Sequence, residues 1–245
     1  RFSTSKIVIF CCLASLLFSL AACSEYQAVL KSKDPELKYQ KALTFFNDKQ
    51  YVKAQTLLDE VTSYYRGTDR SQDVLIYLSR SYMGQKDYIA AAEYYQAYIR
   101  NYPKGRYIVE AQFQVGHCYY LEAPDARLDQ TDTRKAIEFF TRFVELYPDN
   151  PYAQQAYQEM NELYDKLAHK ELLSARLYYN LGTYLGNNYL SAEIVAKNAL
   201  EDYPTNKYQE ELNWIILQAK YQQVINSVDS KREERARETE DEYYS

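Results

Sequence analysis

Histidine and cysteine are the residue types that most often bind metals or act as nucleophiles, and this chain has few of them. His117 and Cys118 are adjacent, but no second histidine or cysteine lies at metal-ligand spacing, and His169 is far along the chain. A half-buried helix explains the pair better than a reactive site does. Glycine-rich phosphate loops and the G-x-S-x-G and H-E-x-x-H motifs are also absent. We therefore expect no catalytic site, no metal and no cofactor in this chain, which is predicted not to be an enzyme.

Cys23 is the residue whose surroundings predict a covalent modification. A short basic start leads into the uncharged segment 7–20, and Ala21 and Ala22 separate this segment from the cysteine. This order is typical of a secretory signal peptide, and the apolar segment is too short to span a bilayer. We therefore predict a signal peptide over residues 1–22.

The position of the cysteine directly after two small residues resembles the lipobox of bacterial lipoproteins. In that motif the cysteine becomes the first residue of the mature chain and carries acyl chains such as palmitate, several of which give stable membrane attachment. The resemblance implies lipidation of Cys23 and a lipidated linker over residues 23–34, and Ser24 fits sorting to the outer membrane. The alternative is an ordinary signal peptide with a cysteine at the cleavage site by chance.

The composition argues against a nucleic-acid partner and against a disulfide framework. Removal of residues 1–22 takes away two basic and no acidic side chains, so the net charge falls from −5 to −7 and no basic face stands out to neutralise phosphates. Cys11, Cys12 and Cys23 belong to the signal and the lipidation site, which leaves Cys118 without a cysteine to pair with. Six glycines and abundant Ala, Leu, Tyr, Gln, Lys and Glu predict helices nearly throughout.

A four-residue Tyr-x-x-Ala pattern recurs along the chain and marks a structural repeat. It occurs at Tyr51–Ala54, Tyr88–Ala91 and Tyr189–Ala192, with Thr133–Ala136 as a variant. Tyr-Pro pairs close three of the four helices that these motifs open, at Tyr102-Pro103, Tyr147-Pro148 and Tyr203-Pro204. Proline cannot continue a helix, so each pair ends a repeat. A Tyr-x-x-Ala helix closed by proline resembles the tetratricopeptide repeat, a helix–turn–helix unit that stacks into a superhelix.

The repeat predicts an all-α fold, a right-handed α-solenoid of about five helix hairpins over residues 35–228. The expected helices span residues 35–49, 51–65, 71–85, 88–101, 106–121, 132–147, 151–167, 170–186, 189–202 and 206–228. An exposed loop is expected within the third hairpin, near residues 122–130. The register slips at the fourth hairpin, because Tyr189 falls in the first helix of the fifth pair. Residues 229–245 are expected to form a charged tail or a helix extension.

The first helices of the hairpins line the concave surface of such solenoids, and matching positions on them predict a peptide groove. The candidate groove residues are Tyr39, Phe46, Arg80, Phe113, His117 and Tyr120. Their rings and one cation suit an extended or helical peptide with aromatic side chains, with Arg80 and His117 as polar contacts. For most adjacent aromatic pairs in this chain, however, the simpler interpretation is that both rings belong to the core.

The whole of the chain after the signal peptide resembles the BamD family of outer membrane assembly lipoproteins, the tetratricopeptide-repeat family also called YfiO-like. The resemblance rests on the lipobox, on Asp34-Pro35 before the first helix, and on the hairpins with Tyr-Pro closures. Its characteristic stretches are Tyr39-x-x-Ala42 with Tyr51-x-x-Ala54, Tyr88–Ala91 through Tyr102-Pro103, and Ala175–Tyr179 through Tyr203-Pro204. The loop near residues 122–131 and the charged end depart from the family pattern.

This resemblance implies a non-enzymatic scaffold on the periplasmic face of the outer membrane, within the β-barrel assembly machinery. Residues 35–148 would receive unfolded outer membrane protein clients in the groove. Residues 149–228 would dock on the barrel-forming, BamA-like subunit, with Arg176 and Lys197 as candidate docking residues. No nucleic acid is implied as a partner.

Two other functions remain open from the sequence. One is a different repeat-bearing envelope adaptor, for example in cell division or peptidoglycan synthesis, although such adaptors usually carry a coiled coil and this chain has no sustained heptads. The other is a glycan-binding or glycan-cleaving lipoprotein built on helical repeats. That function would need a catalytic glutamate in a cleft or a second domain, for which the hairpins leave little room.

Overall fold

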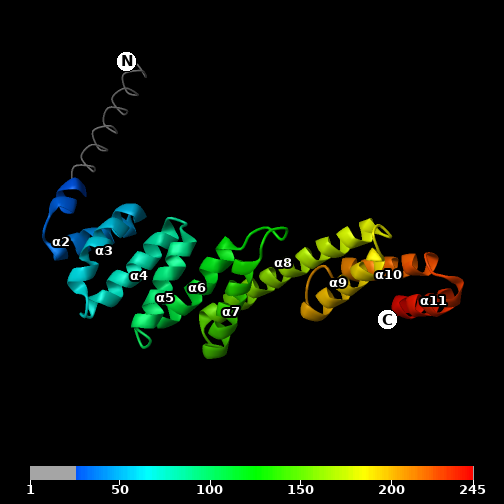
Figure 1. The fold of residues 1–245 in the computed structure, drawn as a ribbon. Helices are drawn as coiled ribbons and strands as arrows, with labels where there is room; N and C mark the ends of the chain where they lie inside the picture. The colour runs from blue at the N-terminus through cyan, green and yellow to red at the C-terminus, as the bar shows by residue number, and fades with distance from the viewer. Residues whose placement is uncertain (1–25, 245) are drawn as a thin grey trace, which may run out of the picture. The chain divides into compact units, whose positions relative to one another are not determined.

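The computed structural model describes residues 26–244, which contain α-helices and the turns between them (Figure 1). A short helical stretch at residues 26–31 precedes the complete helices. Those helices are α2 (Pro35–Asn47), α3 (Tyr51–Tyr65), α4 (Arg70–Gly84), α5 (Tyr88–Asn101), α6 (Ile108–Glu122), α7 (Thr131–Leu146), α8 (Pro151–Leu181), α9 (Asn188–Asp202), α10 (Gln209–Ile225) and α11 (Asp229–Tyr244). The predicted all-α class is therefore confirmed, and most of the expected helices are present within a few residues of their predicted bounds.

Residues 26–244 divide into two compact units, with the boundary between Cys118 and Tyr119. In the first unit, consecutive helices from α2 to α5 pack against one another, and α2 also contacts α4. In the second unit, α8 packs against α7, α9 and α10, and α11 packs against α10. The division between the units falls inside α6, whereas the predicted functional division lies at residues 148/149.

The Tyr-x-x-Ala repeat occupies equivalent places in the structure. Its tyrosines lie at the start of α3, α5 and α9, and its alanines have no exposed surface. An alanine at such a position lets a neighbouring helix approach closely, which a larger side chain would prevent. The fully buried motif alanines are Ala54, Ala91, Ala136 and Ala192.

The Tyr-Pro pairs end helices as predicted. Tyr102, Tyr147 and Tyr203 are the C-cap residues of α5, α7 and α9, and each backbone N–H donates to a carbonyl of the last helical turn. The proline that follows cannot donate such a bond, so the helix stops there. At the other end, Asp34 and Asn150 accept hydrogen bonds from the first backbone N–H groups of α2 and α8, each followed by a proline.

One prediction fails between residues 167 and 170, where two helices were expected. The structure has a single helix there, α8, which is 31 residues long. No glycine or proline lies between Pro151 and Gly182, and the buried residues Leu163, Leu167 and Leu172 continue one apolar stripe across the expected break. The helix ends only at Gly182, whose φ of +55° suits a glycine after a helix C-terminus.

The continuous α8 also removes the predicted slip in register. Because α8 pairs with α9, the Tyr189 motif lies on the second helix of its hairpin, as the motifs of α3 and α5 do. The apparent slip arose from placing a turn where the chain has none.

The charged C-terminal segment forms a helix of its own, α11, rather than a tail or a continuation of α10. The chain turns after Ile225, and Arg235 Nη1 of α11 donates to Ser227 Oγ in that turn at 2.7 Å. Lys220 of α10 bonds Glu242 near the end of α11, with Nζ and Oε2 2.6 Å apart. The two helices are therefore antiparallel, and among the described residues α11 has no buried side chain.

Candidate functional site

The six predicted groove residues lie on α2, α4 and α6, and five of them belong to the first unit. Arg80 of α4 is the predicted cation, and its guanidinium makes two bonds to Glu110 of α6, with Nε 2.7 Å from Oε1 and Nη2 2.5 Å from Oε2. The same guanidinium lies 5.2 Å from the ring centroids of Tyr77 and Tyr107. Burial works to lower the pKa of Arg80, but the hydrogen bonds and charge of Glu110 outweigh it and raise the pKa. Arg80 thus braces two successive hairpins, and the donors of its guanidinium are already bonded to Glu110.

Tyr39 and Phe113 lie in the core, which corrects their assignment to the groove surface. Phe113 is 1% exposed and Tyr39 is 6% exposed. Arg70 covers the Tyr39 ring at 4.9 Å from its centroid. Burial and the charge of Asp73 raise the pKa of Tyr39 to about 12, so its hydroxyl stays protonated. Neither ring is available to a peptide in this structure.

Phe46 and His117 keep partly exposed rings on α2 and α6. Phe46 meets Tyr51 and Tyr77 edge to face, with centroids 5.5 and 5.1 Å apart. His117 stacks on Phe113 with an interplanar angle of 15°. Of the predicted aromatic contacts in the first unit, these two are the ones that a bound side chain can reach.

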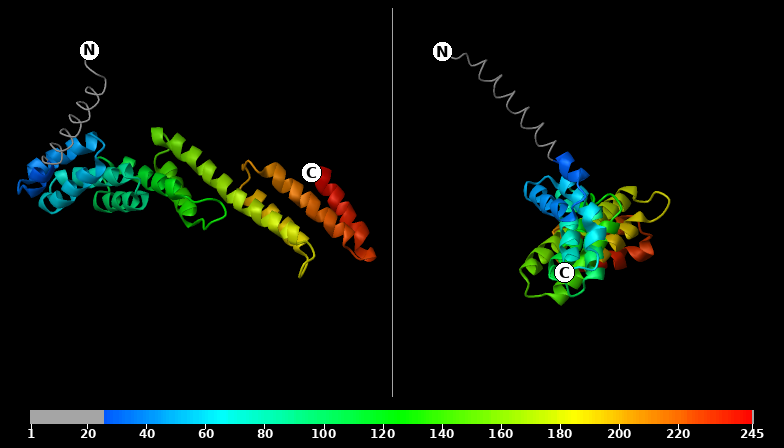
Figure 2. Two further views of the ribbon diagram at one scale, coloured as in Figure 1. Left: turned by 90° about the horizontal axis from the view of Figure 1, so that it is seen from above. Right: turned by 90° about the vertical axis from the view of Figure 1, so that its left-hand side faces the viewer.

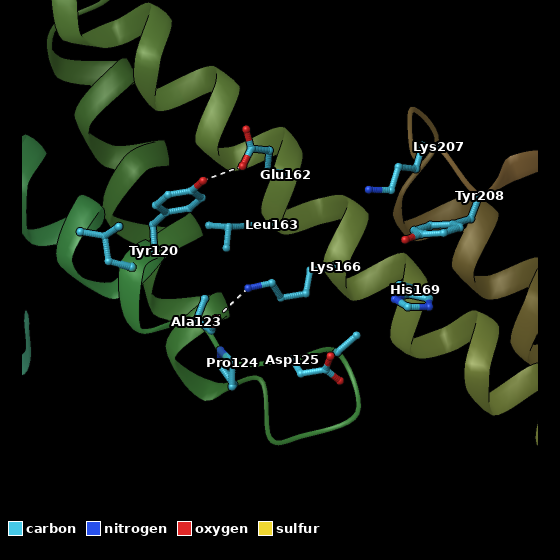
Figure 3. A pocket seen from close by; sticks show the side chains of 12 residues that line it. Tyr120, Ala123, Pro124, Asp125, Glu162, Leu163, Lys166, His169, Lys207 and Tyr208 are labelled. Atoms are coloured by element: carbon cyan, nitrogen blue, oxygen red, sulfur yellow. Dashed lines mark hydrogen bonds between the residues drawn. The ribbon is translucent and has the colours of Figure 1, made fainter.

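Tyr120, the sixth predicted groove residue, belongs to the second unit and lines a separate cavity of about 630 Å³ (Figure 3). The walls come from the end of α6 with the loop that follows it, from α8, and from the turn before α10. The lining residues are Tyr120, Leu121, Ala123, Pro124, Asp125, Ala126, Glu162, Leu163, Lys166, His169, Lys207 and Tyr208. The Tyr120 hydroxyl donates to Glu162 Oε2 at 2.5 Å, and this bond together with burial raises the pKa of Tyr120 to about 12.

Two lysines of α8 hold the inserted loop over this cavity. Lys166 Nζ donates to the Ala123 carbonyl at 2.8 Å, and Lys170 Nζ donates to the Leu128 carbonyl at 2.7 Å. The buried Gln130 adds a bond from Nε2 to the Asp125 carbonyl at 2.8 Å. Burial lowers the pKa of Lys166. The loop was expected to be exposed between helices, and the lysines that hold it were missed, although their i,i+4 spacing on one helix face was visible in the sequence.

The opposite wall of the cavity is a stacked pair of rings. His169 and Tyr208 lie 4.8 Å apart between centroids at an angle of 15°, and Lys207 Nζ lies 5.2 Å from the Tyr208 ring. Lys207 Nζ is 3.8 Å from Asp165 Oδ2. The cavity lining itself carries two carboxylates, Asp125 and Glu162, and two lysines, Lys166 and Lys207. Within residues 26–244, no cluster of three His, Cys, Asp or Glu side chains is arranged to hold a metal ion.

The two predicted docking residues already have partners within the second unit. Arg176 of α8 pairs with Glu211 of α10, and both side chains are about half exposed. Lys197 Nζ of α9 lies 3.0 Å from Glu193 and 3.2 Å from Glu242 of α11. Arg176 therefore lies on an accessible surface, whereas Lys197 is part of the contact that holds α11.

An aromatic groove in the second unit was not predicted at all. A cavity of about 650 Å³ lies between α10 and α11, and its walls include Tyr179, Trp214, Tyr221, Tyr243 and Tyr244. A smaller one, about 320 Å³, shares Tyr179 and Trp214 and reaches Arg176. This groove depends on the packing of α11 against α10, which the expectation of a charged tail or a helix extension does not include.

Cys23 lies outside the residues that the structure describes. Among residues 26–244, no helix combines the length and the apolar character that crossing a bilayer requires.

Stacked helix hairpins with aromatic surfaces define a helical-repeat protein. A comparison with protein families then places the chain more narrowly. Residues 31–237 match the model of the YfiO family, described as outer membrane lipoproteins, and the chain belongs to this family. The curated relatives given below are named as assembly factors, a non-enzymatic role, and the chain is not an enzyme.

Two curated relatives carry the same name, outer membrane protein assembly factor BamD. The one from Pasteurella multocida is 25% identical over 183 residues, which cover 71% of this chain and 70% of the relative. The one from Caulobacter vibrioides is 27% identical over 132 residues, covering 51% of this chain and 43% of the relative. A solved structure from Bacteroides ovatus, titled as a candidate protein-binding protein, matches with a TM-score of 0.43 at 12% identity, covering 86% of this chain and 98% of that one.

Proposed function

We propose that this chain is a non-enzymatic scaffold lipoprotein that acts in the assembly of outer membrane β-barrel proteins. The family match carries the proposal, because it runs from residue 31 to residue 237 and so includes all the hairpins of both units. The two relatives named as assembly factors support the same process. Depletion of the protein from cells should lower the amount of folded barrel proteins in the outer membrane. Normal barrel levels after depletion would contradict the proposal.

The proposed anchor is the lipid on Cys23, which would hold the protein on the periplasmic face of the outer membrane. The lipobox and the family description support this anchor. Cys23→Ala should abolish labelling of the protein with radioactive palmitate and release it from membrane fractions. Labelling that persists in the variant would place the lipid elsewhere.

The proposed client surface in the first unit is centred on Phe46 and His117. Both rings are partly exposed on first helices, and Tyr77 extends the aromatic surface beside Phe46. We propose that this surface receives aromatic side chains of unfolded barrel proteins. Phe46→Ala should weaken binding of a peptide from the C-terminal strand of a barrel protein by about 1–2 kcal/mol.

Val52→Ala is a matched control for that experiment, since Val52 is an exposed apolar residue of α3 in the same unit. Its affinity for the peptide should equal that of the wild type. Equal affinity of the Phe46 variant would remove Phe46 from the client surface.

The proposed contact with the barrel-forming subunit lies around Arg176. Its half-exposed pair with Glu211 borders the cavity that reaches Trp214, so a charged contact and an aromatic surface are adjacent. Arg176→Glu should reduce co-purification of the barrel-forming subunit. Arg142→Glu is the control, because Arg142 is also exposed in the second unit and pairs only loosely, 3.4 Å from Glu138. Equal losses in both variants would indicate a general charge effect.

A further inference from the structure

The turn between α8 and α9 exposes large apolar side chains at a convex tip. Leu185 is 90% exposed and Tyr184 is 67% exposed, and Leu181 at the end of α8 is also exposed. Neither Tyr184 nor Leu185 lines any of the cavities described above. A cluster of exposed apolar residues is typical of a surface that contacts a membrane or another protein.

The backbone of this turn has an unusual conformation at the exposed Leu185. Leu185 has a φ of +55°, a left-handed conformation that is unusual for a leucine, and it lies between Gly182 at +55° and Gly186 at +150°. A non-glycine residue in this region is strained, and such strain is often kept at functional sites.

Several backbone groups of the turn are bonded within it. The Asn188 side chain donates from Nδ2 to the Tyr184 carbonyl at 2.7 Å, and the Asn188 backbone N–H donates to the Gly182 carbonyl at 2.9 Å. The Tyr184 N–H donates to the Leu181 carbonyl at 3.0 Å. Because backbone groups that are already paired lose little on leaving water, these bonds lower the cost of moving the turn into the interfacial region of a bilayer.

Charge is absent over a long stretch around this tip. Residues 177–192 contain no charged side chain, although 26% of the chain is charged, and they include four leucines and four tyrosines. Residues 221–228, which form the end of α10 and the turn to α11, are also uncharged. A neutral surface rich in tyrosine and leucine complements the boundary between lipid headgroups and acyl chains, where tyrosine is enriched.

The two uncharged segments lie at the same end of the second unit. Gln223 near the end of α10 donates to Glu193 near the start of α9 at 2.8 Å, which places the turn after α10 beside the turn before α9. In the left view of Figure 2 both turns lie on one side of this unit, and the turn between α9 and α10 lies on the other. That opposite turn is charged, with Asp202 and Lys207. Both turns at the first end are therefore uncharged, and the exposed charges there begin with Asp229 at the start of α11.

We propose that the turn at residues 181–187 inserts Tyr184 and Leu185 into the interfacial region of a lipid bilayer. The proposal rests on the outer membrane placement of the proposed function, which puts a bilayer within reach of the protein. A second, non-covalent contact of this kind adds to a lipid anchor and limits the orientations of the second unit on the membrane surface.

A tryptophan reporter tests the insertion. Trp214 is the single tryptophan of the chain, so Tyr184→Trp in a Trp214→Phe background reports on the tip alone. The full lipoprotein is reconstituted into phosphatidylethanolamine–phosphatidylglycerol vesicles whose acyl chains carry bromine, a short-range quencher. The fluorescence emission of this reporter should shift to shorter wavelength and be strongly quenched by the bromine atoms. Native Trp214 serves as the comparison, because it lies about 16 Å along α10 from Ile225 and should be quenched several-fold less.

A charge at the tip provides the second arm. Leu185→Asp in the reporter background should remove the bromine quenching, and Val52→Asp, at an exposed position in the other unit, should leave it unchanged. Circular dichroism and the thermal midpoint check that both variants are folded. Quenching of the tip reporter no greater than that of Trp214 would overturn the proposal. A blue shift of the reporter that appears when the purified barrel-forming subunit is added without vesicles, and not with vesicles alone, would also overturn the proposal. It would show that the tip contacts a protein. The proposed function has its own readout, the level of folded barrel proteins after depletion, so either proposal can fail without the other.

Discussion

Gly84 at the end of α4 lies directly against the ring of Tyr51 at the start of α3. A Cβ atom added at Gly84 would stand 2.5 Å from Cδ2 and Cε2 of that ring and 2.6 Å from Cγ. Tyr51 is the tyrosine of the first Tyr-x-x-Ala motif, so the motif ring and the glycine form one close contact between successive hairpins. Because Cγ lies next to the backbone, the ring cannot simply swing aside.

Gly84→Ala should therefore destabilise the protein, although alanine is a better helix former by about 1 kcal/mol. The overlap with Tyr51 should cost about 1–3 kcal/mol, as overpacking does elsewhere, and so exceed that gain. Urea unfolding measures the change. In a Tyr51→Ala background the same substitution should be neutral or stabilising, and a loss of stability that is the same in both backgrounds would show that the ring is not the cause.

Removal of the Arg80 brace should also lower stability. Arg80→Met keeps much of the apolar stem but leaves the carboxylate of Glu110, whose side chain is 20% exposed, without its cation. We expect a loss of about 1–3 kcal/mol in the free energy of unfolding. Arg142→Met removes an exposed pair and should change stability by about 0–1 kcal/mol. Equal effects in thermal unfolding would mean that the brace adds no more than a surface pair.

Ala91 tests the packing of the repeat motif. It has no exposed surface, so Ala91→Leu should overfill the contact between α5 and its neighbours and cost about 1–3 kcal/mol. Ala136→Leu at the variant motif should act in the same direction. The exposed Ala28 offers a control, since Ala28→Leu adds the same atoms outside the core. A thermal midpoint equal to that of the control would contradict the assigned role of the motif alanines.

Attachment of α11 should depend on pH through Glu242. Burial acts to raise the pKa of Glu242, but hydrogen bonds from Lys220 and Lys197 outweigh it and lower the pKa below the ordinary value of 4.5. Glu193 also pairs with Lys197 and Lys220, so the two lysines stand between two carboxylates. A carboxylate whose pKa is lower in the folded state stabilises it fully above the unfolded value, and this stabilisation is lost as the pH falls through the folded pKa. Residues 229–244 should therefore lose hydrogen-exchange protection on acidification below about pH 4.5 and in high salt.

Glu242→Gln should produce the same loss of protection at neutral pH. The control is Glu233→Gln, because Glu233 pairs with Arg237 within α11 and is almost fully exposed. If protection of α11 is unchanged in the Glu242 variant, contacts other than these charges hold the helix.

The fold could be predicted largely because its signals are local. Each Tyr-x-x-Ala motif predicts a helix start and a close contact, and each Tyr-Pro pair predicts a helix end, so the hairpins before Pro148 were placed well. The prediction of a break within α8 was wrong for a related reason. It followed from the average length of a repeat, whereas no glycine, proline or capping residue at that position requires a turn. An average repeat length is weaker evidence than the residues at the position itself.

The candidate sites were less predictable, because exposure depends on which helices meet. Tyr39 and Phe46 both occupy α2 and both looked suitable for a groove, yet Tyr39 is covered by Arg70 from the next hairpin. Lys197 looked like a free docking cation, but α11 folds back and places Glu242 beside it. Both outcomes depend on contacts between distant segments, which helix periodicity alone does not specify.

The unbroken α8 has a consequence for the way the second unit unfolds. In repeat proteins whose hairpins are separated by turns, terminal repeats can open one at a time. Here a single rod of 31 residues supplies partners to α7 at one end and to α9 and α10 at the other. Loss of either end exposes apolar surface on the same rod, so the two hairpins should melt in one cooperative step and show one common free energy of opening in native-state hydrogen exchange.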